Sequence, residues 1–210
     1  MQALKQRDNA VQRTHVPMEF VGKARTLRSK VLKAYADFED ARDKITAPFR
    51  PRPGWTPMPR LALLRALPVA WRALPSFCRL RLVAGFDDAE RKLQIAELHL
   101  APSSIYGAWS GDDEPALAIL LHTVAIAPPA FRETHTLIAA IGLHALARRV
   151  ERGADRSDAA VLRDFHPLAT AMPAGVKQGG EFAIPCPESG GRWLGAVAEG
   201  KYLLCRTWVR

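Results

Sequence analysis

The sequence predicts an α+β fold, in which a long N-terminal helix and a proline-rich arm precede a domain with a mainly antiparallel sheet. Three observations support this prediction. Apolar residues recur with a helical period from residue 17 to residue 45, and five prolines then fall between residues 46 and 60. At the C-terminus, two strand-like segments, 192–198 and 201–209, flank the turn Glu199-Gly200 and predict a β-hairpin.

The chain divides into three predicted parts. Residues 1–15 are a flexible basic lead, residues 16–75 are a basic helical region that contains the arm (46–60), and residues 76–210 are an α+β core domain. The 210 residues are 48% hydrophobic and 24% charged, which is typical of a globular protein. The lead lacks the apolar stretch of a secretory signal, and Pro128-Pro129 interrupts the longest uncharged run, 115–131. We therefore expect no membrane segment.

The helix predicted over residues 17–45 carries an apolar seam. Its apolar residues follow alternating steps of four and three over almost four heptads, so they share one face. Two interpretations are open. The seam packs on the protein's own body, or it forms a homo- or hetero-oligomer in which Phe20, Leu27, Val31 and Phe38 bind the partner. The seam consists of Phe20, Ala24, Leu27, Val31, Ala34, Phe38, Ala41 and Ile45.

Positive charge is concentrated near the N-terminus. Residues 1–82 hold seventeen Lys and Arg and six Asp and Glu, whereas residues 83–210 hold thirteen and fifteen. The whole chain has a formal net charge of +9. Such an asymmetry is typical of proteins with a polyanionic partner, although a basic composition also arises without that function. On the predicted helix the cations lie off the apolar seam and are expected to be exposed.

The proline-rich arm alternates aromatic and guanidinium side chains. This pattern suits a phosphate backbone with bases stacked on the aromatic rings. It equally suits an extended arm that lies along a protein partner, or a surface connector whose Trp55 enters the core. The residues that carry the pattern are Phe49, Arg50, Arg52, Trp55 and Arg60.

The elements of the core domain have signals of unequal clarity. Apolar and basic residues alternate over 79–86, which predicts a strand, whereas 92–100 is ambiguous between strand and helix. Residues 117–127 predict a buried strand or a short core helix. Residues 131–152 predict the clearest helix of this half, because apolar residues surround most of its circumference and Gly153 follows as a stop. A shorter helix capped by Asp155 or Ser157 and an edge strand at 181–186 come next.

A two-residue turn at Glu199-Gly200 fixes a register for the C-terminal hairpin. It pairs Ala198 with Lys201 and Val197 with Tyr202.

The histidines provide no metal-binding motif. His135 and His144 lie nine residues apart on the helix predicted over 131–152, on opposite faces, so they cannot share an ion. We therefore expect no metal site. His144, followed by Arg148 and Glu151, is one candidate catalytic base, and His166 is another.

Other features argue against common cofactors and disulfides. The chain has no glycine-rich nucleotide-binding motif, so we expect no cofactor. Three widely spaced cysteines without a C-x-x-C motif fit a reducing, cytoplasmic setting.

These observations favour a nucleic-acid-binding accessory protein, or a subunit of a nucleic-acid machine, that contacts phosphates with little sequence specificity. Its partner is DNA, RNA or an acidic protein surface. One alternative is a structural or adaptor protein of a multisubunit assembly. The other is a small metal-independent hydrolase or nuclease that uses His144 or His166, although the lack of catalytic motifs disfavours an enzyme. The predicted nucleic-acid-binding residues are Arg25, Arg28, Lys30, Lys33, Arg50, Arg52, Trp55 and Arg60.

Overall fold

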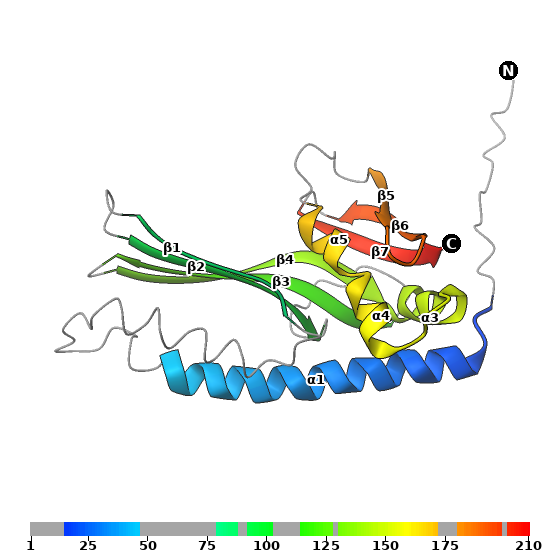
Figure 1. Ribbon diagram of the computed structural model, residues 1–210. Coiled ribbons are helices and arrows are strands. Elements are labelled where there is room, and N and C mark those ends of the chain that lie inside the picture. Colours follow the sequence, from blue (N-terminus) through cyan, green and yellow to red (C-terminus); the bar gives the residue numbers. More distant parts are fainter. Residues whose placement is uncertain are drawn as a thin grey trace, which may run out of the picture.

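The computed structural model describes residues 15–46, 79–87, 92–102, 114–127, 130–171, 180–198 and 201–210. In these residues a seven-stranded sheet, in the order β1-β2-β3-β4-β7-β6-β5, lies alongside one long helix, α1 (Met18–Thr46) (Figure 1). The predicted α+β class is confirmed, with its N-terminal helix, mainly antiparallel sheet and C-terminal hairpin. The basic lead up to residue 14 and the arm from residue 47 lie outside the described residues.

The sheet consists of two antiparallel halves joined by one parallel pair. Strands β1 to β4 form a meander, and β7, β6 and β5 form the second half. The halves meet where Ala139, Ala140 and Ile141 of β4 run parallel to residues 203–205 of β7. The strands are β1 (Arg79–Asp87), β2 (Lys92–Pro102), β3 (Pro115–Ala127), β4 (Ala130–Gly142), β5 (Glu181–Cys186), β6 (Gly191–Ala198) and β7 (Tyr202–Val209).

The helix predicted over residues 131–152 is wrong in its first half. Residues 130–142 form strand β4, and helix α3 (Leu143–Arg152) begins only after Gly142. The β-branched residues Thr134, Thr136 and Ile138 favour the extended conformation. The strand is completed by its pairing with β3 on one side and β7 on the other. His135 is consequently a strand residue, which changes its neighbours.

The C-terminal hairpin forms, but its register differs by one residue from the prediction. Ala198 pairs with Tyr202 and Val197 with Leu203. The Lys201 N–H donates a hydrogen bond of 3.0 Å to the carbonyl oxygen of Ala198, so Lys201 belongs to the turn. The turn is therefore one residue longer than expected. Strand β5 lies at the sheet edge, as predicted.

The apolar seam of α1 packs on the protein's own body. Phe20, Leu27, Val31 and Phe38 are at most 7% exposed and belong to one core with residues of β2, β3 and α3. The first of the two interpretations of the seam is thus confirmed. Because these four side chains are buried within the chain, they present no surface to a partner, and the partner-binding role predicted for them does not fit this fold.

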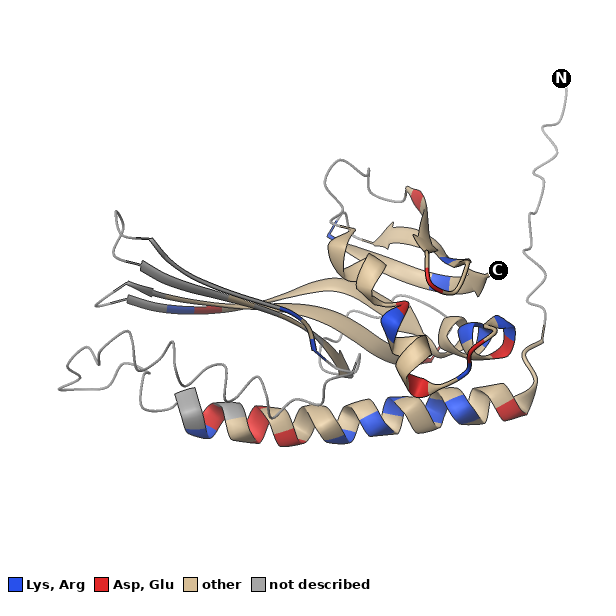
Figure 2. Cartoon of the chain, viewed as in Figure 1, with Lys and Arg blue, Asp and Glu red and all other residues tan. Residues whose placement is uncertain are grey.

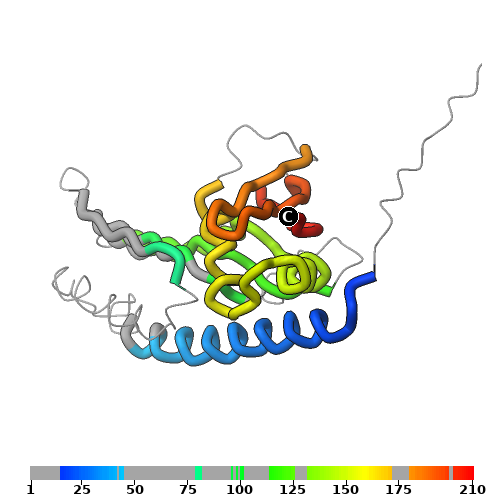
Figure 3. The backbone as a smooth tube through the Cα atoms, turned by 45° about the vertical axis from the view of Figure 1, so that its right-hand side comes forward, coloured from blue at the N-terminus to red at the C-terminus, as the bar shows by residue number. Residues whose placement is uncertain are grey.

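Three short helices lie between β4 and β5 in the described part of the chain. They are α3, α4 (Asp158–Arg163) and α5 (His166–Thr170). The predicted cap of α4 is confirmed, since the Ser157 side chain accepts a hydrogen bond from the Ala160 N–H. Figure 3 shows α1 running beside α3 and α4. In the described residues no helix has both the length and the apolar content that a bilayer crossing requires.

Candidate metal centre

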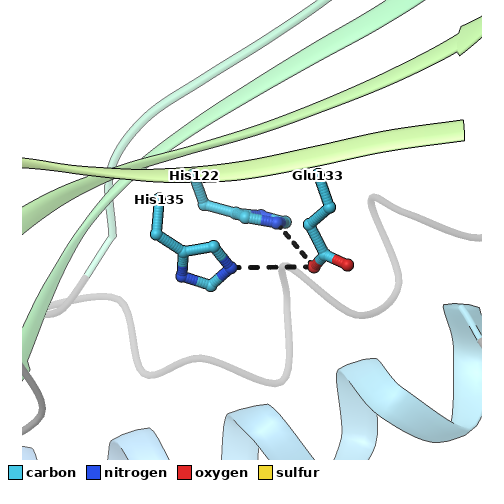
Figure 4. A group of neighbouring side chains, drawn as sticks. All are labelled: His122, Glu133 and His135. Atoms are coloured by element: carbon cyan, nitrogen blue, oxygen red, sulfur yellow. Dashed lines mark hydrogen bonds and ion pairs between the residues drawn. The ribbon is translucent and has the colours of Figure 1, made fainter.

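Two histidines and a glutamate meet on the β3–β4 hairpin. His122 lies in β3, and Glu133 and His135 lie two residues apart in β4. In the ladder His122 pairs directly with His135, and Val124, two residues along β3, pairs with Glu133. Because side chains alternate between the two faces of a strand, all three project from the same face. Figure 4 shows them projecting toward the side on which α1 lies.

The ligand atoms of these three residues are close enough to bind one ion. His122 Nε2 lies 2.8 Å from Glu133 Oε1, and His135 Nε2 lies 3.7 Å from the same oxygen. The two imidazole centroids are 4.5 Å apart. One ligand atom from each residue lies within 4.8 Å of the other two. In a tetrahedral site with metal–ligand bonds of about 2.0–2.1 Å, ligand atoms are about 3.3 Å apart. The two measured separations bracket this value.

The three side chains differ in their exposure to solvent. His122 is fully buried, whereas the side chains of Glu133 and His135 are 24% and 31% exposed. A buried imidazole needs a hydrogen-bond partner, and Glu133 supplies one. An ion can therefore reach the cluster from the side of Glu133 and His135, with His122 as its innermost ligand.

The donor set determines which ions the cluster suits. Imidazole nitrogens favour zinc and other divalent transition metals over Ca²⁺ and Mg²⁺, which prefer oxygen ligands. Two histidines and one carboxylate also form the protein ligand set of some catalytic zinc sites, where water or substrate occupies the fourth position. Such an arrangement can lower the pKa of a bound water or polarise a carbonyl or phosphoryl oxygen.

The histidines predicted to be catalytic lie outside this cluster. His144 is half-buried in α3, where Arg148 Nη1 lies 2.6 Å from Glu151 Oε2. His166 is exposed at the start of α5. A catalytic role for either residue stays a prediction. The prediction of no metal site assumed that His135 lies on a helix with His144, whereas His135 lies in β4 directly opposite His122.

The predicted nucleic-acid-binding residues fall into two groups. Arg25, Arg28, Lys30 and Lys33 lie on α1, and Arg28 alone among them is half-buried rather than exposed. The other four lie outside the described residues: Arg50, Arg52, Trp55 and Arg60.

Acidic side chains of the same chain contact three of these four predicted residues on α1. Arg25 Nη2 lies 3.1 Å from Glu114 Oε2, and Arg28 contacts the other carboxylate oxygen of Glu114. The hydrogen bond from Arg25, together with Arg28, holds the pKa of Glu114 below its ordinary value. Lys30 Nζ lies 2.5 Å from Asp158 Oδ2. Lys33 has no ion pair with another described residue.

One spacing in the sequence could have revealed the cluster. His122 and His135 are equally distant from Pro128-Pro129, so a hairpin around these prolines pairs them directly. This signal becomes visible only once residues 130–142 are assigned to a strand.

No family model, curated protein or solved structure matches the chain. Its function is therefore inferred from the geometry of its own residues.

Proposed function

We propose that this protein binds a divalent transition-metal ion, with Zn²⁺ as the best fit, through His122, Glu133 and His135. The observation that carries this proposal is the convergence of one ligand atom from each residue within 4.8 Å. Two paired strands hold the ligands, and sites built on strands are positioned more accurately than sites on loops. With three protein ligands, one position stays open for water or a substrate, as in catalytic zinc sites.

The proposal is tested by calorimetric titration of the protein with Zn²⁺. The wild-type protein should bind one ion per chain with a saturable isotherm. Glu133→Gln removes the anionic ligand with little change in shape, and His135→Ala removes the most exposed ligand. Loss of an outer-shell partner alone costs 10–100-fold in metal affinity, so loss of a direct ligand should weaken binding by roughly 100-fold or more.

A matched control is needed because the chain has six histidines. His166→Ala removes an exposed imidazole from α5, outside the cluster, and should leave the affinity unchanged. Thermal unfolding of each variant shows whether it is folded at the temperature of the titration. The proposal fails if His166→Ala and His135→Ala weaken binding equally, or if the wild-type protein shows no one-to-one binding.

Nucleic-acid binding is a second candidate function, favoured by the distribution of charge on α1. Residues 18–33 hold five Lys and Arg and one acid, whereas residues 34–46 hold two and four. Figure 2 shows the basic residues gathered on the N-terminal half of the helix. Phosphates must compete with Glu114 and Asp158 for three of these cations, so we expect modest affinity and a strong dependence on salt.

Titration with labelled single- and double-stranded DNA and RNA at two salt concentrations tests this second function. Binding should weaken steeply as salt rises, and its absence at low salt would contradict the proposal.

For such an accessory protein a reducing, cytoplasmic location fits best, because Cys186 and Cys205 are both free thiols.

A further inference from the structure

A groove with a volume of about 480 Å³ lies between the N-terminal half of α1 and the segment that contains α3 and α4. The residues that α1 contributes are spaced three and four apart, so they form one stripe of the helix. The floor of the groove is apolar, since Leu27, Val150 and Val161 are at most 3% exposed. Its rim is charged.

Two cations at the rim converge on one aromatic ring. Lys23 Nζ lies 5.8 Å and Arg156 Cζ lies 5.0 Å from the centroid of the Phe20 ring. Arg156 is held in place by a hydrogen bond of 3.0 Å from its Nη2 to the carbonyl oxygen of Glu151. In the part of the chain that the structure describes, neither Lys23 nor Arg156 has a carboxylate within ion-pair distance.

The remaining charges of the groove leave an excess of positive charge. Lys30 and Asp158 neutralise each other, with 2.5 Å between Nζ and Oδ2. Lys23 and Arg156 are then opposed only by Glu19 among the lining residues. An anion that enters the groove and contacts Lys23 and Arg156 would gain charge-assisted hydrogen bonds.

A glycine in the wall of the groove leaves room for a molecule to approach the helix backbone. Gly22 lies within α1, where glycine is destabilising relative to alanine. A Cβ atom added to Gly22 would meet no atom within 4 Å. Packing within the described residues therefore does not require glycine at this position. Glycine does permit close approach of a bound molecule to the backbone.

We propose that this groove binds a phosphate group, held by Lys23 and Arg156, with the rest of the ligand over Gly22 and the apolar floor. Ammonium and guanidinium groups both bind phosphate oxygens, the first as a point charge and the second through its fork of N–H donors. Two sources share this chemistry, a mononucleotide and a nucleic-acid strand. Of these two ligands, only the strand depends on the nucleic-acid binding proposed above. Binding of either ligand is independent of the metal centre.

The test measures fluorescence anisotropy with two probes, a labelled adenosine monophosphate and a labelled ten-nucleotide DNA strand. Lys23→Gln and Arg156→Gln should each weaken binding about tenfold, the effect of one charge-assisted hydrogen bond. Lys44→Gln removes the same charge from the same helix outside the groove and is the matched control, because Lys44 lies in the acidic C-terminal half of α1 and pairs with Asp40. It should change the affinity by less than about twofold if binding is local rather than a response to net charge.

A second variant separates binding from folding. Gly22→Leu fills the groove while replacing glycine with a better helix former, so the Tm should stay the same or rise while binding is lost. Ser29→Leu, at an exposed position of α1 outside the groove, should bind like the wild-type protein.

The outcomes distinguish the groove from the nucleic-acid function. If only the monophosphate binds, the groove is a phosphate site but its ligand is not a nucleic-acid strand. If the strand binds and Gly22→Leu abolishes this binding, both the groove and the nucleic-acid function are supported. The proposal is overturned if neither probe binds, if Gly22→Leu binds like wild type, or if Lys23→Gln and Lys44→Gln have equal effects.

Discussion

At the scale of single residues, the buried arginine of α3 shows how a costly charge is accommodated. Arg149 is 1% exposed, and its Nε donates to a carboxylate oxygen of Asp164. Its Nη1 and Nη2 donate to the carbonyl oxygens of Asp155 and Ala160 at 3.0 and 3.3 Å. The guanidinium carbon also lies 5.2 Å from the centroid of the Trp208 ring. Arg149 therefore joins α3 to the segment 155–164 and to β7.

We predict that Arg149→Met lowers the free energy of unfolding by about 3–5 kcal/mol, because it leaves the Asp164 carboxylate buried without its cation. Denaturant unfolding of the wild-type protein and the variant measures the difference. Arg163→Met is the control, since Arg163 and Glu188 form an exposed pair at 3.4 Å. Its loss should cost less than about 1 kcal/mol. An equal decrease in the free energy of unfolding in the two variants would show that burial of the ion pair does not determine the effect of losing its arginine.

The two buried thiols should be unreactive in the folded protein. Burial raises the pKa of Cys186 to about 11, assisted by the Asp164 carboxylate, and burial also raises the pKa of Cys205. In a Cys78→Ser variant, which removes the cysteine outside the described residues, a disulfide reagent at pH 8 should label the remaining thiols only after denaturant is added. Rapid labelling of the native variant would contradict the burial of these groups.

The same pKa shift predicts alkaline destabilisation. An unfolded thiol ionises near its ordinary pKa of about 8.5, whereas folded Cys186 stays protonated to about 11. The unfolded state therefore binds fewer protons above pH 9, and stability falls as the pH rises from about 9 toward 11. Denaturant unfolding should give a lower free energy of unfolding at pH 10.5 than at pH 8. In Cys186→Ala this decrease should be smaller.

At the scale of elements, α1 could be predicted and β4 could not. The seam of α1 repeats over almost four heptads, and no other structure produces that period. In β4, by contrast, Arg132, Thr134, His135 and Thr136 are all exposed, and a continuous apolar run follows them. No period of two is visible in such a segment. Its conformation is decided by pairing with β3 and β7, which a local pattern does not contain.

This single element accounts for the missed site. Placing His135 on a helix removed His122 from consideration as its neighbour. A one-residue error in the C-terminal hairpin had no such consequence, because that hairpin carries no ligand of the cluster.

The packing of α1 leads to a prediction about stability and assembly. Phe38 is fully buried in the core, so Phe38→Ala should lower the free energy of unfolding by about 3–5 kcal/mol. Leu32, which is 48% exposed on the same helix, provides the control, and Leu32→Ala should cost less than about 0.5 kcal/mol. Because the seam packs within one chain, the Tm of the wild-type protein should not depend on protein concentration. If the seam joined two chains instead, the Tm would rise with protein concentration.

At the scale of the whole molecule, the net charge is visible in the sequence but its neutralisation is not. The acids that contact Arg25, Arg28 and Lys30 lie 89, 86 and 128 residues away along the chain. The fold brings them to α1 and leaves Lys23 and Lys33 without such a contact among the described residues. The two proposed sites lie in different places, the metal centre on the β3–β4 hairpin and the groove beside α4, so each can be removed without the other.

Anomalous diffraction from crystals grown with Zn²⁺ would show whether the proposed metal centre on the β3–β4 hairpin binds an ion. Data collected on both sides of the zinc absorption edge distinguish Zn²⁺ from other ions. We predict one strong peak within about 2.0–2.2 Å of His122 Nε2, His135 Nε2 and a carboxylate oxygen of Glu133. A peak at His144 or His166 instead, or none at the β3–β4 hairpin, would contradict the account.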